Sequence, residues 1–147
     1  EELKLVNDYL LLEKLRYSEK LNYTINVDNT VNQDIEVPQM LLHTFAENAI
    51  KHGLMSEKGY GYLNIHIFSK DSNGITILIE DDGIGREKAK LYNLDSTRIG
   101  LSTLEKQISL YNLNNIQKIT LEIFDKIEKG VAIGTKIIIF IPFNYTY

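Results

Sequence analysis

Two strand-like runs joined by a short polar turn constrain the fold of this chain of 147 residues more than any other feature. The runs cover residues 62–68 and 75–80, and the turn between them contains Asp71-Ser72-Asn73-Gly74. A glycine-containing turn between two apolar runs is typical of a β-hairpin. The chain is therefore predicted to fold around an antiparallel pair of strands.

The other periodic segments place helices and further strands around this pair. Helices are predicted over residues 1–21, 38–53 and 101–111. Strands are also predicted over residues 23–27, 119–124 and 135–141, the last two separated by a Lys/Glu-rich turn. The order predicts an α+β fold, an α/β sandwich whose mixed, mostly antiparallel sheet is covered on one face by helices.

Composition and charge exclude several classes of protein. The chain has no cysteine, which excludes a disulfide framework, a zinc–thiolate site and a cysteine nucleophile. Sixteen basic and 20 acidic residues give a net charge of −4, so we expect no nucleic-acid partner and no direct membrane contact. The longest apolar stretch, residues 137–141, is far shorter than the roughly 20 residues of a transmembrane helix.

The beginning of the chain resembles neither a signal peptide nor a natural N-terminus. It reads Glu1-Glu2-Leu3-Lys4, without an initiator Met, and predicts a soluble piece of a longer protein. The helix over residues 1–21 carries more than one apolar stripe. It either packs against its own domain or contacts a partner helix outside this sequence, and the pattern leaves both alternatives open.

A first polar grouping lies on the second predicted helix. Thr44, Asn48 and Lys51 fall at i, i+4 and i+7, on one face beside the apolar stripe. The Asn48 amide oxygen is a suitable ligand for Mg²⁺, and Lys51 is a cation that can contact a phosphate. On its own the pattern equally fits a solvated helix face.

A second grouping, Glu80-Asp81-Asp82-Gly83-Ile84-Gly85-Arg86, directly follows an apolar strand. Gly83 and Gly85 allow close backbone approach to a ligand or positive φ. A carboxylate at the strand end can accept a hydrogen bond from an adenine amine, whereas guanine presents a carbonyl there. The segment matches neither a phosphate P-loop nor an EF-hand, and an acidic turn remains the alternative.

Two further glycines mark a third grouping and the last strand. Ile99-Gly100-Leu101 opens the third predicted helix, where free backbone amides can bind an anion, although an ordinary helix start fits as well. Gly134-Thr135-Lys136 enters the final isoleucine-rich strand, where a glycine bend is sufficient as a structural explanation.

Taken in chain order, these groupings resemble the GHKL ATP-binding fold of gyrase, Hsp90, histidine kinases and MutL. Ala46-Glu47-Asn48-Ala49-Ile50-Lys51-His52-Gly53 resembles its Asn-bearing helix. Asp81-Asp82-Gly83-Ile84-Gly85 resembles its first glycine box, and Ile99-Gly100-Leu101 its second. Gly134-Thr135, before a strand that ends at Pro142, resembles its closing motif.

The same helix, taken with the earlier Tyr9-Leu10-Leu11-Leu12-Glu13-Lys14-Leu15-Arg16-Tyr17, is most similar to the LytS/YehU-like sensor histidine kinases. This resemblance implies an ATP-binding catalytic domain over residues 22–147. Residues 1–21 would be the C-terminal end of a dimerisation and phosphotransfer helix. The implied setting is a cytoplasmic domain of a bacterial inner-membrane sensor protein.

The resemblance also implies a role for each matching residue. Asn48 would coordinate the Mg²⁺ that bridges the ATP phosphates, and Lys51 would contact phosphate. Asp81 would bind the adenine amine in a pocket shaped by Gly83 and Gly85. The resemblance also implies a mobile lid over residues 86–98, with a hinge at Gly100 and Leu101. Thr135 would lie beneath the adenine, near Asp81.

Two positions depart from the family's pattern. Arg98 stands where the second box often has its first glycine, which affects the lid's flexibility or places a cation near phosphate. Asp82 stands where Asn is frequent and adds negative charge near the nucleotide. A degenerate GHKL module that binds nucleotide or a protein without kinase activity is the alternative function.

Two features favour phosphoryl transfer to histidine over ATP hydrolysis. Relatives that hydrolyse ATP carry Glu as general base where this chain has Thr44, and Glu47 points about 100° away around the helix, where it is expected to pair with Lys51. His43, His52 and His66 are not in a segment resembling the family's phosphoacceptor helix. The implied partners are therefore an upstream phosphoacceptor region in a homodimer and a response regulator.

Overall fold

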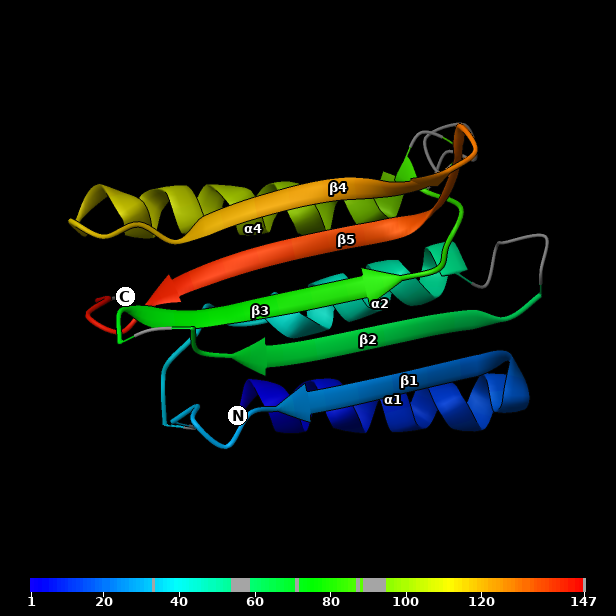
Figure 1. Ribbon diagram of the computed structural model, residues 1–147, viewed down its shortest axis with the longest axis horizontal. Coiled ribbons are helices and arrows are strands. Elements are labelled where there is room, and N and C mark those ends of the chain that lie inside the picture. Colours follow the sequence, from blue (N-terminus) through cyan, green and yellow to red (C-terminus); the bar gives the residue numbers. More distant parts are fainter. Residues whose placement is uncertain (33, 54–58, 71, 87, 89–94, 147) are drawn as a thin grey trace.

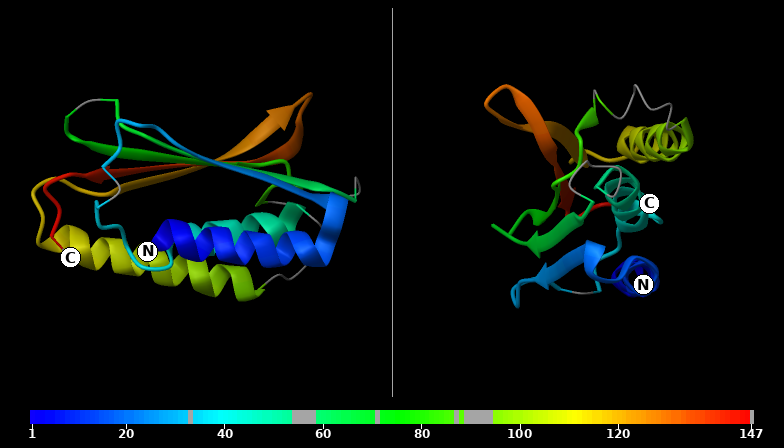
Figure 2. Two further views of the ribbon diagram at one scale, coloured as in Figure 1. Left: turned by 90° about the horizontal axis from the view of Figure 1, so that it is seen from below. Right: turned by 90° about the vertical axis from the view of Figure 1, so that its right-hand side faces the viewer.

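The computed structural model describes residues 1–32, 34–53, 59–70, 72–86, 88 and 95–146. Within these residues the chain forms two layers, a five-stranded sheet and three α-helices that cover the same face of that sheet (Figures 1 and 2). The predicted α+β sandwich with a mixed, mostly antiparallel sheet is therefore confirmed.

The strand order places the acidic, glycine-containing segment at the centre of the sheet. The helices are α1 (Glu2–Tyr17), α2 (Leu41–Gly53) and α4 (Asp95–Leu113), and a short 3₁₀ turn, η1 (Ser18–Lys20), follows α1. The strands are β1 (Leu21–Val27), β2 (Gly61–Phe68), β3 (Gly74–Asp81), β4 (Thr120–Glu128) and β5 (Val131–Pro142). Their spatial order is β1-β2-β3-β5-β4, with β1 and β2 parallel and the other neighbours antiparallel. Since β3 is the middle strand, the residues at its end are flanked by other strands on both sides.

The core forms because alternate residues of the central strands point toward the helices. Ile77 of β3 lies between Ile67 of β2 and Ile139 of β5, and all three are buried. Ile75 and Ile79 repeat this pattern along β3. The buried row of β3 ends at Asp81, so the period-2 pattern brings a carboxylate to the face that the helices cover.

The helices cover the sheet with continuous apolar stripes. The buried face predicted for α2 is confirmed and comprises Leu41, Leu42, Phe45, Ala46, Ala49 and Ile50. In α1, Val6 and Leu10 are buried in the same core, and Glu2 accepts hydrogen bonds from the Met40 and Leu42 amides at the start of α2 (2.6 and 3.2 Å). Within the described residues, no helix is long and apolar enough to cross a membrane.

A second apolar stripe of α1 faces away from the domain. It is formed by Leu5, Leu11, Leu12 and Leu15, whose exposed fractions range from 41% to 79%. The helix therefore packs on its own domain, which is one of the two predicted alternatives, and it also presents an exposed apolar stripe.

Several element boundaries differ from those predicted. The third helix begins at Asp95 instead of Leu101, so Gly100 lies inside α4. The second begins at Leu41 instead of Pro38, and the first ends at Tyr17. The Lys/Glu-rich segment is mostly strand, because its turn comprises Lys129 and Gly130 alone, which both have positive φ as tight hairpins require.

Candidate functional site

Asp81 is the centre of a compact polar arrangement at the end of β3. Its side chain is 6% exposed, and Asn115 is the other buried polar side chain among the described residues. The Asp81 Oδ1 atom accepts hydrogen bonds from the backbone amides of Gly83 (2.8 Å) and Thr135 (3.2 Å). Three of the predicted site residues therefore meet, although Thr135 is 54 positions further along the chain.

Burial sets the acidity of this carboxyl. It raises the pKa of Asp81 to about 6, because the apolar surroundings disfavour the charged form. The amides of Gly83 and Thr135 and the charge of Lys126 lower the pKa of Asp81, and the charge of Asp82 raises it. At neutral pH Asp81 is therefore a buried carboxylate, an acceptor suited to a ligand that donates a hydrogen bond.

The approach of β5 to Asp81 depends on a glycine. Gly134 has φ +143°, and a Cβ atom there would lie 2.0 Å from the Asp81 carbonyl oxygen. Any side chain would therefore push the two strands apart. The same carbonyl oxygen accepts a hydrogen bond from Lys126 Nζ of β4 (2.8 Å).

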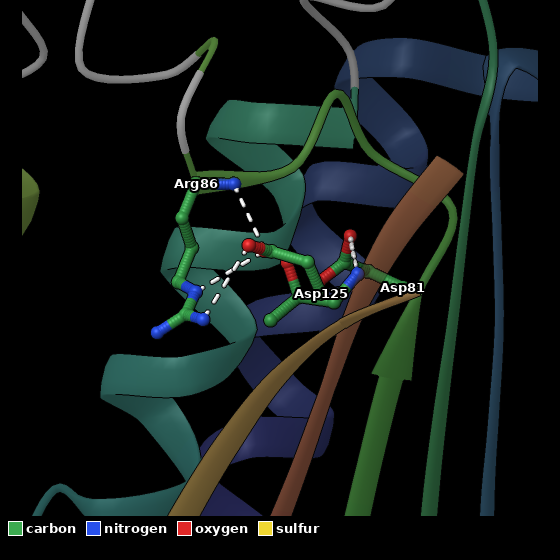
Figure 3. Close-up of polar contacts among 4 residues, drawn as sticks. Asp81, Arg86 and Asp125 are labelled. Atoms are coloured by element: carbon green, nitrogen blue, oxygen red, sulfur yellow. Dashed lines mark hydrogen bonds and ion pairs between the residues drawn. The ribbon is translucent and has the colours of Figure 1, made fainter. Parts of the chain in front are cut away.

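The segment after Asp81 is fixed on both sides. Asp82 Oδ1 accepts a hydrogen bond from the Tyr62 amide on β2 (2.6 Å), so its carboxylate is engaged at the strand edge. On the other side, the backbone amide and guanidinium of Arg86 donate to the Asp125 carboxylate of β4 at 3.1 to 3.4 Å. Figure 3 shows the Arg86–Asp125 pair beside Asp81. These contacts hold residues 81–86 against two neighbouring elements.

The polar face of α2 is as predicted from its spacing. Thr44, Asn48 and Lys51 are all half-buried. Lys51 Nζ lies 2.6 Å from Glu47 Oε1, which confirms the expected i, i+4 pair. The Asn48 side-chain amide makes no hydrogen bond to a described residue.

The second glycine box packs against this helix. A Cβ atom at Gly100 would lie 3.4 Å from Thr44 Cγ2, so α4 meets α2 beside the polar face. Because Gly100 and Leu101 lie inside α4, the expectation that they open the helix is wrong. Residues 87 and 89–94 of the predicted lid, and the Arg98 side chain, lie outside the described residues.

A separate hollow of about 630 Å³ lies at the opposite end of the sheet. It is bounded by the β1–α2 connection, the start of α1 and the beginning of β3, with Val31, Pro38 and Ile75 among its lining residues. It is lined by none of the predicted site residues that the structure describes.

Sequence comparison relates the chain to bacterial proteins that include a sensor histidine kinase/phosphatase. No protein-family model matches the sequence. YwpD of Bacillus subtilis (strain 168), an uncharacterised protein, is 29% identical over 113 residues, which are 77% of this chain and 38% of YwpD. The sensor histidine kinase/phosphatase LytS of Staphylococcus aureus (strain N315) is 32% identical over 99 residues, 67% of this chain and 17% of LytS. The chain thus spans well under half the length of either relative.

Solved structures identify the fold. The catalytic domain of the histidine kinase ThkA has a TM-score of 0.66 at 16% identity, covering 97% of this chain and 92% of that domain. Full-length ShkA in complex with AMPPNP has a TM-score of 0.65 at 17% identity, covering 97% of this chain and 30% of ShkA. This chain is a homologue of LytS with the GHKL fold of histidine kinase catalytic domains.

In this LytS homologue, the contacts around Asp81 include residues that sequence motifs do not reveal. Lys126, Asp125 and Ala132 all contact residues 81–86 from the β4–β5 hairpin. The sequence predicts a Lys/Glu-rich turn between residues 124 and 135, whereas β4 extends to Glu128 and β5 begins at Val131. The apolar alternation of the sequence stops at Phe124, because Asp125 and Lys126 follow it and the register of β4 and β5 shifts between Lys126 and Ile127.

Proposed function

We propose that this LytS homologue binds ATP with Mg²⁺ and transfers the γ-phosphoryl group to a histidine in an upstream region. The buried Asp81 carboxylate, held by two backbone amides at the end of the central strand, carries this proposal. ShkA, which has the same fold, is described in complex with the ATP analogue AMPPNP. That complex supports a nucleotide as the ligand of the present site.

The base-binding part of the proposed site is formed by Asp81, Gly83, Gly85 and Thr135. One carboxylate oxygen of Asp81 is occupied by the amides of Gly83 and Thr135, while no described residue donates to Oδ2. A buried carboxylate oxygen accepts from the adenine amine, whereas the guanine carbonyl would place two acceptors together. We therefore propose that the pocket selects adenine over guanine.

The phosphate-binding part is assigned to α2 and the start of α4. Asn48 offers a hard amide oxygen without a described partner, and Lys51 offers a cation one turn further along. The proposed contacts from α4 are Arg98, Gly100 and Leu101. No group of three His, Asp or Glu side chains that would hold a metal exists among the described residues, which fits a Mg²⁺ ion bound by Asn48 and the phosphates. Bound there, Mg²⁺ would neutralise charge on the transferred phosphoryl group.

The residues around Asn48 favour transfer to a protein over hydrolysis. Thr44 lies one turn before Asn48, and its hydroxyl is no base near neutral pH. Asn48 and Lys51 would instead orient the phosphates toward an incoming histidine, so the rate depends on positioning and charge stabilisation. We assign both residues the catalytic role.

The proposed partners follow from this reaction and from the surface of α1. Its uncovered stripe, Leu5, Leu11, Leu12 and Leu15, would pack against the upstream phosphoacceptor region of a homodimer. In this proposal residues 1–21 end the dimerisation and phosphotransfer helix, and residues 22–147 form the catalytic domain. The phosphohistidine would pass its phosphoryl group to a response regulator. The homology to a sensor kinase supports a cytoplasmic domain of a bacterial membrane sensor.

Calorimetric titration with nucleotides tests the proposal directly. The protein is titrated with ATP and with GTP, each with and without Mg²⁺. We expect ATP to bind more tightly than GTP, and Mg²⁺ to increase the affinity for ATP. Equal binding of the two nucleotides would refute the assignment of Asp81 to the base, and failure to bind ATP would refute the proposed function.

A further inference from the structure

We propose that Lys126 is a positioning residue for Asp81: it reaches across β5, fixes the end of β3 and places a positive charge beside the base-binding carboxylate. No sequence motif marks this lysine. The inference rests on the proposed function, because it assigns Lys126 to the same ATP site.

The route of the Lys126 side chain depends on the sheet order. Lys126 lies on β4 and Asp81 on β3, with β5 between them. The residue of β5 directly opposite Lys126 is Gly134, which has no side chain to block the path. Lys126 Nζ therefore reaches the Asp81 carbonyl oxygen at 2.8 Å, the atom that a Cβ at Gly134 would approach to 2.0 Å.

An irregularity in the hairpin accompanies this contact. The register between β4 and β5 shifts between Lys126 and Ile127. Such a bulge locally re-aims side chains and increases the twist of the strand. In Figure 1 the β4–β5 turn and the carboxyl end of β3 lie at the same end of the sheet. The register shift therefore occurs at Lys126, the residue that connects the β4–β5 hairpin to Asp81.

Lys126 is the cation that acts on the Asp81 carboxyl among the described residues. Arg86, the other nearby cation, is paired with Asp125, and Lys136 lies in register with Glu80, the residue before Asp81. Asp82 acts in the opposite direction and raises the pKa of Asp81. Lys126 lowers the pKa of Asp81 and therefore offsets part of the increase caused by burial and by the charge of Asp82.

The consequence is a wider pH range for nucleotide binding. A protonated Asp81 would lose the charge-assisted hydrogen bond to the adenine amine. Without the Lys126 ammonium, burial and Asp82 would raise the pKa of Asp81 further, toward neutral pH. Lys126 thus keeps the Asp81 carboxyl ionised in the pH range in which ATP must bind.

The test compares Lys126→Gln and Lys126→Met with Lys126→Arg, which keeps the charge. Lys129→Gln is the control for the loss of one positive charge, since Lys129 lies in the turn of the same hairpin. Two quantities are measured between pH 5.5 and 8.5: the Kd for ATP by calorimetry, and the midpoint of the Asp81 carboxyl titration by NMR.

We expect both neutral variants to raise the Asp81 midpoint by about one pH unit. ATP binding should then weaken about twofold at pH 7 and about fivefold at pH 6, and recover at pH 8.5. Lys126→Arg and Lys129→Gln should follow the wild-type curve. Recovery at high pH separates this role from general damage to the fold, which would lower affinity at every pH.

Three outcomes would overturn the inference. The first is an unchanged midpoint of the Asp81 carboxyl titration in both neutral variants. This result overturns the inference whether or not the protein binds nucleotide. The second is a loss of ATP affinity that is the same at every pH, and the third is a Lys126→Arg curve that matches Lys126→Gln. A wild-type protein that fails to bind ATP while the Asp81 midpoint still moves would instead refute the proposed function alone.

Discussion

Gly85 lies directly against Ala132, so that a Cβ atom added to Gly85 would approach Ala132 Cβ to 2.5 Å. The contact joins the segment after Asp81 to β5, and Gly85 has φ +76°, which favours glycine. We predict that Gly85→Ala destabilises the protein by about 2–5 kcal/mol, from backbone strain together with overpacking. Urea denaturation followed by circular dichroism measures the loss.

Gly130→Ala is the matched control for this prediction. Gly130 has a similar φ of +79°, but a Cβ atom there would meet no atom within 4 Å. Gly130→Ala should therefore destabilise the protein through backbone strain alone, by about 1–2 kcal/mol. Equal losses for the two variants would show that the Ala132 contact contributes nothing.

Asp81→Asn is predicted to weaken ATP binding while stabilising the protein at neutral pH. The amide loses the charge-assisted hydrogen bond to the adenine amine, which costs about 1.5–3 kcal/mol, or roughly ten- to a hundredfold in affinity. Calorimetry with ATP measures this loss. Asp82→Asn should retain ATP binding, because the Asp82 carboxylate is engaged by Tyr62 instead. Wild-type affinity in Asp81→Asn would remove Asp81 from the site.

The stability change has a defined dependence on pH. The pKa of Asp81 is about 6 in the folded protein and 3.8 as its ordinary value, so the folded state holds the proton more tightly. Its contribution to the unfolding free energy is therefore present below pH 4 and is lost as the pH rises to about 6. Above that range Asp81→Asn should be more stable than wild type by about 1–3 kcal/mol. Parallel stability curves between pH 4 and 7 would contradict the burial effect on Asp81.

A third prediction concerns the ion pair on α2. Glu47 and Lys51 form an ion pair with about two fifths of each side chain exposed. A phosphate must compete with Glu47 for the Lys51 ammonium, so Glu47→Gln should strengthen ATP binding by up to about fivefold. Lys51→Met should weaken it. If Glu47→Gln leaves the Kd for ATP unchanged and Lys51→Met does too, Lys51 does not contact the phosphates.

The layers and the polar clusters of this domain were accessible from local sequence patterns. The alternation along β3 and the helical spacing of α2 depend on each segment's own residues, so the apolar faces and the position of Asp81 were predictable. The start of α4 was not predictable in this way, because a glycine normally marks the end of a helix and Gly100 lies inside α4. Gly100 is tolerated inside α4 where the helix packs closely on Thr44.

The contacts that complete the site arise from pairing between distant strands. Lys126 reaches Asp81 because Gly134 happens to lie opposite it, and this depends on the register of β4 and β5. Arg86 binds Asp125 for the same reason. A single sequence contains no local signal for register, and the Lys/Glu-rich composition of the hairpin favours a loop.

Asn48→Ala is predicted to reduce the effect of Mg²⁺ on ATP binding. The substitution removes a hard oxygen ligand and leaves the base-binding residues intact. Titration with ATP should therefore show a larger loss of affinity with Mg²⁺ than without it. Thr44→Ala, on the same helix face, is the control and should leave the Mg²⁺ dependence unchanged. If Mg²⁺ changes the ATP affinity of wild type and of Asn48→Ala equally, Asn48 does not bind the metal and is an ordinary polar residue of the helix face.

The last prediction is that the 147-residue chain binds ATP with Mg²⁺ but neither labels itself nor hydrolyses ATP rapidly. His66 is hydrogen-bonded to Asp28 (2.9 Å), and the His43 ring packs against that of Tyr9, with ring centroids 4.6 Å apart. The His52 side chain lies outside the described residues, and no histidine is in a segment resembling the phosphoacceptor helix. Without a positioned nucleophile the reaction lacks a proximity effect that can reach about 7–11 kcal/mol.

Radiolabelled ATP distinguishes the possible outcomes of this prediction. The chain is incubated alone, then with the upstream phosphoacceptor region supplied in the same polypeptide or separately, and the products are treated with acid. We expect label only when that region is present, and we expect acid to remove it, because phosphohistidine is acid-labile. Substituting the acceptor histidine by Gln should abolish the label. Acid-stable label on the chain alone would indicate a serine kinase, and brisk phosphate release would indicate an ATPase. Either result would refute phosphoryl transfer to histidine as the activity of this domain.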